Sequence, residues 1–133
     1  MLNHKIKILI AETSLNKAIL TQKYLGEYGL PSSTVCGDGI DALRWFNEED
    51  FDLLIINWML PGISAEDLIH TARLLKEDKK FSTLAILPQR KREMITRVID
   101  LNIEGYLISP VTSDCLYEKI SPIIDTLIPE NMR

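Results

Sequence analysis

A single polar residue, Asn57, ends an apolar run and precedes a Pro-Gly turn in the stretch Leu53-Leu54-Ile55-Ile56-Asn57-Trp58-Met59-Leu60-Pro61-Gly62. Such a run is typical of a buried parallel strand, and sites in open α/β sheets lie at the carboxyl ends of these strands. An amide at this place donates and accepts hydrogen bonds, but it carries no full charge. Asn57 is therefore unsuited to nucleophilic attack on phosphorus, which a carboxylate there could perform.

The length of 133 residues predicts one domain, with a core over residues 5–127 and a frayed C-terminal tail over 128–133. The formal net charge of −4 gives no general attraction to nucleic acid or to anionic membrane. No apolar stretch reaches the roughly 20 residues of a membrane span, and the N-terminus lacks a signal-peptide core. Cys36 and Cys115 fit neither a redox pair nor a metal site, so we expect buried thiols and a cytoplasmic protein.

Short apolar runs alternate five times with amphipathic segments along the chain. The expected strands lie at 6–10, 34–36, 53–56, 84–87 and 106–108. The expected helices lie at about 14–28, 39–48, 64–79, 90–102 and 112–127. This alternation predicts an α/β fold, in which helices cover both faces of a doubly wound parallel sheet.

Local signals indicate where these helices begin and end. Thr13 or Ser14 is suited to cap the first helix, Ser64 to cap the third, and Gly29 to end the first in the left-handed conformation. Pro122 interrupts the apolar stripe of the last helix, because an interior proline removes one backbone hydrogen bond. We therefore expect a kink or a break just before Pro122.

Three further motifs accompany the strand that ends at Asn57: Asp38-Gly39-Ile40-Asp41-Ala42-Leu43, Met59-Leu60-Pro61-Gly62 and Gly105-Tyr106-Leu107-Ile108-Ser109-Pro110. With them, residues 5–127 resemble the receiver domain of two-component response regulators. The resemblance implies a flavodoxin-like, five-stranded sheet in the order 2-1-3-4-5 with five helices. It also implies a cis bond between Ser109 and Pro110, and a partner-binding face formed by the fourth helix and the fifth strand.

The resemblance further implies where the family's phosphorylation site would lie, and there the chain departs from the family. The two acidic residues after the first strand correspond to Ala11 and Glu12, and the nucleophilic aspartate corresponds to Asn57. The hydroxyl residue after the fourth strand corresponds to Leu87, and the lysine before the proline to Ser109. Only Glu12 keeps its acidic character. At this degenerate pocket, formed by these five residues, we expect no phosphoryl transfer and no catalytic residue.

The expected consequences are electrostatic. Magnesium prefers several hard anionic oxygen ligands, whereas Glu12 supplies a single negative charge, so we expect no metal and no other cofactor. Carboxylates that share a pocket repel each other unless a cation is bound. A pocket that has lost two acidic residues and its lysine together is therefore nearly neutral and needs no metal. We predict that the Asn57 amide or the Ser109 hydroxyl donates to the Glu12 carboxylate, and that Trp58 covers the pocket.

Arg90, Lys91 and Arg92 place positive charges where the fourth helix should begin, against the helix dipole, at a cost of roughly a few tenths of a kcal/mol per residue. One interpretation is a solvated loop, in which Glu93 offsets part of this cost. The other is a docking patch for an acidic segment of a protein partner. Nucleic acid is disfavoured by the acidic net charge and by the lack of interleaved aromatic residues.

Tyr106, Tyr117 and Ile124 complete the candidate interaction face. Tyr106 matches the aromatic residue that changes rotamer on phosphorylation in many receivers, but we expect it to stay fixed and half-buried, because Leu87 cannot relay such a change. Tyr117 and Ile124 form, with Ile128, a second apolar stripe on the last helix. That stripe is either plain core or a surface for a partner or for a second copy of the chain.

Together these features predict a non-phosphorylatable receiver domain that acts in signal transduction through protein–protein contacts. The expected partner is a signalling protein, such as a histidine kinase or an output protein, and homodimerisation is also open. Two alternatives remain, namely phosphorylation at a non-standard residue and regulation by a small ligand in the neutralised pocket. A deep, open pocket beside Asn57 favours the ligand, and a closed one favours a protein adaptor.

Overall fold

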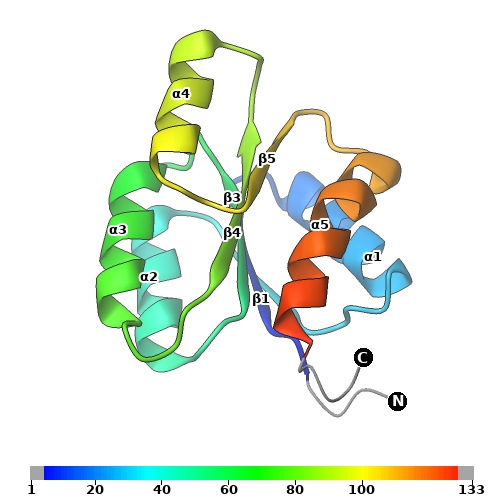
Figure 1. Ribbon diagram of the computed structural model, residues 1–133, viewed down its shortest axis with the longest axis horizontal. Helices are drawn as coiled ribbons and strands as arrows, with labels where there is room; N and C mark the ends of the chain where they lie inside the picture. The colour runs from blue at the N-terminus through cyan, green and yellow to red at the C-terminus, as the bar shows by residue number, and fades with distance from the viewer. Residues whose placement is uncertain (1–4, 129–133) are drawn as a thin grey trace.

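The computed structural model describes residues 5–128, which form one five-stranded parallel sheet in the order β2-β1-β3-β4-β5 (Figure 1). The strands are β1 (Ile8–Ala11), β2 (Ser33–Cys36), β3 (Leu53–Asn57), β4 (Ser82–Leu87) and β5 (Gly105–Ile108). The helices are α1 (Leu15–Glu27), α2 (Gly39–Glu48), α3 (Ala65–Leu75), α4 (Arg92–Asp100) and α5 (Ser113–Leu127). The predicted fold class and strand order are confirmed. Of the tail expected over 128–133, Ile128 occupies the C-cap position of α5, and 129–133 lie outside the described residues.

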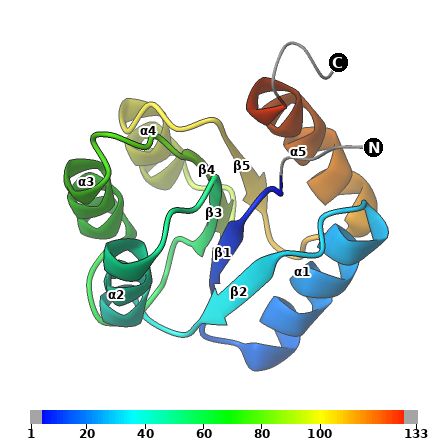
Figure 2. The ribbon, with the colours of Figure 1, turned by 90° about the horizontal axis from the view of Figure 1, so that it is seen from below.

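Helices α1 and α5 cover one face of the sheet, and α2, α3 and α4 cover the other (Figure 2). Strand β3 shows why both faces are covered, because its side chains alternate between two cores. Leu54 and Ile56 belong to the core under α2 to α4, whereas Leu53 and Ile55 belong to the core under α1 and α5. The continuous apolar run of β3 thus fits a central strand that is buried on both sides.

The first and third helices start at the predicted capping residues. Ser14 accepts a hydrogen bond from the backbone N–H of Lys17, and Ser64 accepts one from that of Asp67. Gly29 follows the end of α1 with φ of +96°, a left-handed conformation that glycine adopts without a steric penalty. These local signals fix where the chain leaves the sheet and returns to it.

The expected break in the last helix is not found, because α5 runs without interruption from Ser113 to Leu127 with Pro122 inside it. Ile120 and Ile123 on either side of the proline are buried against the sheet. Pro122 deprives the Glu118 carbonyl of its helical donor, but both residues are exposed, so water can supply the missing bond. Packing of the buried stripe therefore outweighs the cost of the proline.

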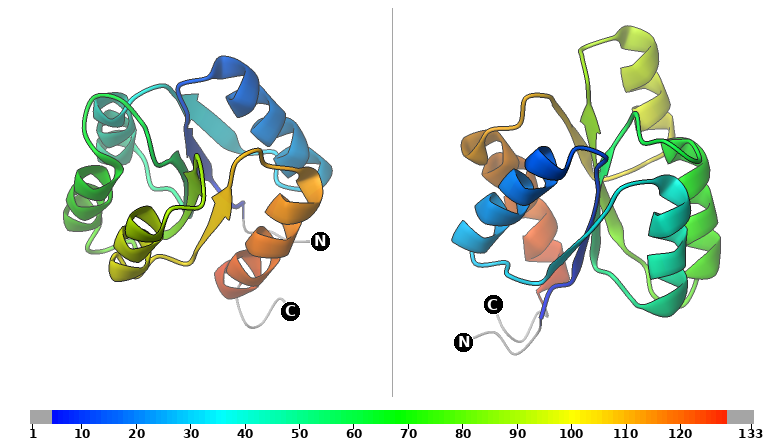
Figure 3. Two further views of the ribbon diagram at one scale, coloured as in Figure 1. Left: turned by 90° about the horizontal axis from the view of Figure 1, so that it is seen from above. Right: turned by 180° about the vertical axis from the view of Figure 1, so that it is seen from behind.

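Helix α4 lies further toward the carboxyl ends of the strands than α2 and α3 do (Figures 1 and 3). Only Val98 of this helix is buried, and α4 ends two residues earlier than the range 90–102 predicts. Its first turn therefore projects beyond the sheet edge. Within residues 5–128, no helix combines the length and the apolar character needed to cross a membrane.

Candidate functional site

The carboxyl ends of the parallel strands bring four residues of the degenerate pocket to one cleft. The register pairs Ala11 of β1 with Ile56 of β3, so Glu12 and Asn57 follow neighbouring strands at the same level. Glu12, Asn57, Leu87 and Ser109 line a cleft of about 390 Å³. Ala11 does not line it, because its side chain is fully buried in the core below.

Asn57 and Glu12 are joined directly. The Asn57 amide Nδ2 donates to Glu12 Oε1 at 3.0 Å and to Oε2 at 3.1 Å. The backbone N–H of Ser14 donates to Glu12 Oε2 at 2.9 Å, and the Asn57 Oδ1 accepts from the backbone N–H of Met59 at 2.9 Å. The predicted hydrogen bond to Glu12 is confirmed, with Asn57 rather than Ser109 as the donor.

An amide is the side chain that this arrangement requires. Asn57 uses its nitrogen as a donor toward Glu12 and its oxygen as an acceptor for Met59 at the same time. A carboxylate at residue 57 could still accept from Met59, but it would place a second negative charge about 3 Å from Glu12. A neutral side chain with both a donor and an acceptor, such as Asn57, therefore suits a position beside one buried carboxylate.

The walls of the cleft are mostly apolar and come from segments far apart in the chain. Residues of α1, of the β4 carboxyl end and of the loop before α5 form them: Leu20, Thr21, Tyr24, Ile86, Leu87, Pro88, Pro110 and Val111. Lys17 and Met59, both exposed, complete the lining. The bond between Ser109 and Pro110 is cis, as the resemblance implied. An open cleft beside Asn57 is the feature that favours the ligand alternative over the closed adaptor.

Trp58 does not cover this cleft, contrary to expectation. Its side chain is 9% exposed and packs in the core on the α2 to α4 side of the sheet. Its neighbour Met59, which is 62% exposed, lines the cleft instead. Successive residues after a strand tend to point to opposite sides, and the turn after β3 decides which of the two faces the cleft.

The α1 residues Leu20, Thr21 and Tyr24 were not predicted as part of the site. They follow no motif, and their helical spacing is equally typical of an ordinary core stripe. They reach the cleft because α1 packs beside the edge at which β1 ends, which is a property of the tertiary structure.

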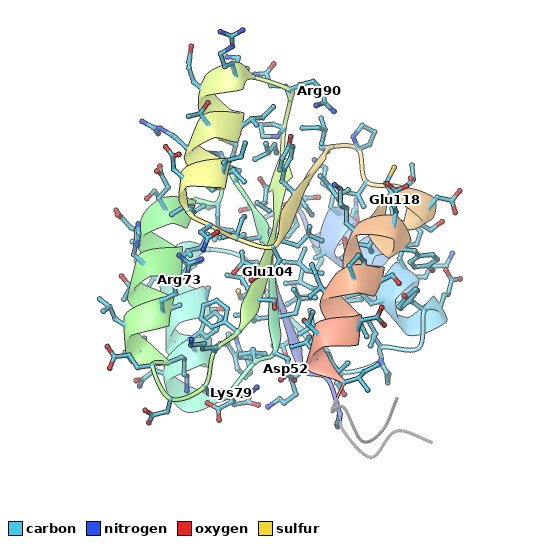
Figure 4. The ribbon with its side chains drawn as sticks, in the orientation of Figure 1. Asp52, Arg73, Lys79, Arg90, Glu104 and Glu118 are labelled. Atoms are coloured by element: carbon cyan, nitrogen blue, oxygen red, sulfur yellow. The ribbon has the colours of Figure 1, made fainter. Side chains whose placement is uncertain are left out.

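Arg90, Lys91 and Arg92 are exposed at the start of α4, as expected. Lys91 occupies the N-cap position and makes no side-chain capping hydrogen bond, while Glu93 lies in the first turn. Arg90 lies at the outer end of the connection between β4 and α4 (Figure 4). Tyr106 is half-buried against the core, and the Lys119 ammonium lies 6.0 Å from its ring centroid.

Tyr117 and Ile124 do not join this face. The Tyr117 ring lies 4.9 Å from that of Tyr28, and its hydroxyl donates to the Tyr24 carbonyl at 2.9 Å. Ile124 is 7% exposed and belongs to the core under α1 and α5. These two residues fasten α5 to α1, so the second apolar stripe of the last helix is core rather than a free surface.

The two cysteines differ, contrary to the expectation that both are buried. Cys36, at the end of β2, is 3% exposed, and its burial, aided by nearby Asp41 and Asp38, raises the pKa of its thiol from 9.0 to about 12. Cys115 is exposed in the first turn of α5, whereas its neighbour Leu116 is buried in the core. Among residues 5–128 no three histidine, cysteine or acidic side chains come together as a metal site.

The response regulator receiver domain family matches residues 8–121 of the chain. The chain belongs to this family. The chemotaxis protein CheY-3 of Vibrio cholerae is 30% identical over 127 residues, which are 96% of this chain and 98% of that protein. The chemotaxis protein CheY of Pseudomonas aeruginosa is 28% identical over 120 residues, which are 90% of this chain and 97% of that protein.

Solved structures of receiver domains share the fold. The crystal structure of a CheY-like receiver domain protein from Methanospirillum hungatei has a TM-score of 0.81 at 20% identity, and covers 92% of this chain and 96% of that one. The chemotaxis response regulator CheY4 of Vibrio cholerae has a TM-score of 0.81 at 17% identity, and covers 90% and 99%. Receiver domains act in two-component signalling, where they interact with kinases or output proteins.

Proposed function

We propose that this receiver domain is a non-phosphorylatable member of its family, which signals through protein–protein contacts without phosphoryl transfer and without catalysis of its own. The observation that carries the proposal is the contact between Asn57 and Glu12. The side chain at the end of β3 is an amide, and both its nitrogen and its oxygen are engaged by neighbours.

The donor set at the cleft does not fit magnesium. The Asn57 oxygen is occupied by the backbone N–H of Met59, and the Glu12 carboxylate accepts from Asn57 and Ser14. Magnesium demands near-octahedral oxygen ligands and is usually held by one or two carboxylates together with the phosphate oxygens of a substrate. Here Glu12 is the single acidic side chain in the cleft lining.

The remaining residues of the degenerate pocket would not stabilise a phosphoryl group. Phosphoryl transfer depends on positioning and on electrostatic stabilisation of charge spread over three oxygens. Leu87 has no donor for such an oxygen, and Ser109 carries no positive charge. A base or a cation could not activate the Asn57 amide either, because the amide oxygen is not nucleophilic enough to attack phosphorus.

The direct test is incubation with acetyl phosphate and magnesium, followed by intact mass spectrometry. We expect no mass gain in the wild-type protein, while a receiver with aspartate at the acceptor position serves as the positive control. A phosphoryl group mapped to Glu12 or Asn57 would overturn the proposal. A group mapped elsewhere would overturn it as well, in favour of phosphorylation at a non-standard residue.

The proposed docking patch for a protein partner comprises Arg90, Lys91 and Arg92. These exposed cations lie at the start of α4, and rim charges of this kind steer an acidic partner segment. The partner would be a histidine kinase, an output protein or a second copy of the chain. The two α5 residues first assigned to this face, Tyr117 and Ile124, are left out of it.

The patch is tested by affinity capture from the native host with all three residues changed to glutamate. The matched control changes Lys5, Lys23 and Lys80 to glutamate, since these exposed lysines give the same net charge away from α4. We expect the patch variant to lose a partner that the control variant retains. Equal capture by both variants would exclude the patch as the docking site.

A second candidate function is regulation by a small ligand in the cleft. The specific observation in its favour is an open cleft of about 390 Å³ beside Asn57, with mostly apolar walls. Volumes of this order, with a few polar groups among apolar walls, are typical of small-molecule sites. A ligand would then replace phosphorylation as the signal that changes partner binding.

A further inference from the structure

Glu12 is a buried carboxylate without a cationic partner. Its side chain is 7% exposed, and no salt bridge within the described part of the chain includes it. Its hydrogen-bond donors are the neutral Asn57 amide and the backbone N–H of Ser14. Lys17 also lines the cleft, but it is exposed and forms no salt bridge with Glu12 among the described residues. A buried carboxylate normally has a cation or a metal beside it, because hydrogen bonds from neutral donors offset only part of its desolvation cost.

The carboxylate also keeps room for another donor. Oε2 accepts hydrogen bonds from Ser14 and Asn57, whereas Oε1 accepts only the bond from Asn57 among those described. A carboxylate offers about four acceptor sites, so Oε1 can accept at least one more bond. Since Glu12 lines the cleft, a donor held in the cleft can supply it.

Ser109 lines the same cleft, and its hydroxyl can accept as well as donate. The remaining walls are mostly apolar, with Leu20, Ile86 and Val111 among them, and exposed Lys17 lies on the α1 wall. The cleft thus combines one carboxylate without a salt-bridge partner, one hydroxyl acceptor and a largely apolar surface. That combination is complementary to a cationic head joined to an apolar tail.

We propose that the cleft binds a small primary ammonium ion with an apolar tail, of the alkylamine class. The ammonium donates to Glu12 Oε1 and to the Ser109 hydroxyl, and the tail packs against the α1 wall. This inference rests on the second candidate function, in which a ligand occupies the cleft. An ammonium ion suits the site better than a divalent metal, since it needs hydrogen-bond acceptors rather than several anionic ligands.

Lys17 makes the sign of the ligand charge testable. This exposed lysine lines the cleft on α1, so its positive charge opposes a cationic ligand and would attract an anionic one. Lys17→Met keeps the aliphatic stem and removes the charge. The change should tighten the binding of an ammonium ion and weaken the binding of a carboxylate.

The experiment titrates the full chain with n-hexylammonium, 1-hexanol and hexanoate, followed by the NMR signals of the Asn57 side-chain amide and of Thr21 and Tyr24. We expect hexylammonium to shift these signals and to bind about tenfold or more tightly than hexanol, because its charge-assisted hydrogen bond is stronger than a neutral one. Shortening the tail by one methylene should weaken binding about fourfold.

Two variants separate the contribution of the ammonium group to binding from that of the alkyl tail. Glu12→Gln should abolish the preference for hexylammonium over hexanol while leaving hexanol binding in place. Ser109→Lys should abolish binding of both, because a tethered ammonium then reaches Glu12 and fills the cleft. Circular dichroism checks that each variant is folded, and Ser109→Ala, which leaves the cleft open, is the matched control for Ser109→Lys.

The inference is overturned if hexanol binds as tightly as hexylammonium, if hexanoate binds most tightly, if the shifted signals lie outside the cleft, or if no probe binds. These titrations contain no phosphodonor, so their failure leaves the proposal of a non-phosphorylatable receiver untouched. Conversely, a phosphoryl group on Asn57 would end that proposal without changing the outcome of the titrations.

Discussion

A buried carboxylate lies at each edge of the sheet, but only one of the two has a cationic partner. At the amino edge, Asp52 is 5% exposed, accepts from the backbone N–H of Lys7 at 2.8 Å and pairs with the Lys79 ammonium at 2.7 Å (Figure 4). At the carboxyl edge, Glu12 is similarly buried, but it accepts hydrogen bonds from the Asn57 amide and has no salt bridge to a cation among the described residues. One charge is compensated within the fold, and the other is left facing an open cleft.

The charges around the two carboxylates also differ between the edges. The amino edge carries two more ion pairs, between Lys7 and Glu49 and between Lys76 and Asp50, so positive charge is plentiful there. The carboxyl edge has Asp38 and Asp41 close to the end of β2, and their charges contribute to the raised pKa of Cys36. The amino edge thus pairs its buried carboxylate with a cation, whereas the carboxyl edge holds Glu12 with neutral donors, as the proposed binding role of the cleft requires.

The largest expected effect concerns the buried thiol of Cys36 at the carboxyl edge. A pKa near 12 keeps Cys36 protonated at mildly alkaline pH, with a thiolate fraction about a thousandfold below that of a thiol with a pKa of 9.0. With iodoacetamide, exposed Cys115 should therefore be alkylated while Cys36 is not, as read by peptide mass spectrometry. Unfolding in urea should expose Cys36 to the reagent. Equal alkylation of both in the folded protein would contradict the burial of Cys36 beside Asp41 and Asp38.

Asp52→Ala should destabilise the protein by about 2–4 kcal/mol, because it removes a buried partner of Lys79 and leaves the N–H of Lys7 without its acceptor. Urea denaturation measures the change in the free energy of unfolding. Asp50→Ala is the matched control, since Asp50 is an exposed member of a surface pair and should have little effect. Equal losses in both variants would remove the distinction between buried and surface pairs.

Asn57→Asp should cost about 1–3 kcal/mol, because it places a second carboxylate beside Glu12 and deletes the amide donor. Adding Glu12→Gln to this variant should restore most of the loss, since the glutamine amide can donate to the new aspartate. Such a double-mutant cycle isolates the interaction between the two residues. Additive losses would mean that the two side chains do not interact.

The smallest expected effect is that of Glu12→Gln alone. Removing a buried charge that lacks a cation should change the free energy of unfolding by less than about 1 kcal/mol in either direction. The isosteric Asp52→Asn should cost more, because it neutralises a carboxylate that has an ion-pair partner. If Glu12→Gln were the costlier of the two, the contrast between the edges would be wrong.

The strands and helices could be predicted from local patterns in the sequence, whereas the strand order was predicted from the resemblance to receiver domains. The apolar run of β3, the caps at Ser14 and Ser64, and Gly29 at the end of α1 each act within a few residues. The helix break expected before Pro122 and the surface role expected for Ile124 were wrong for a common reason. A residue on a helix is judged locally by its type, whereas its environment is set by the elements that the helix packs against.

The sequence by itself determined that residue 57 is an amide and that the residue after β1 is a lone acid, and chemistry then excluded a nucleophile there. Only the tertiary structure decided that Asn57 donates to Glu12, 45 positions away, and that α1 encloses a cleft around them. The physical reason is that these contacts join residues far apart in the sequence. Side-chain type fixes what a group can do, but parallel pairing and helix packing decide which groups meet and how much space remains between them.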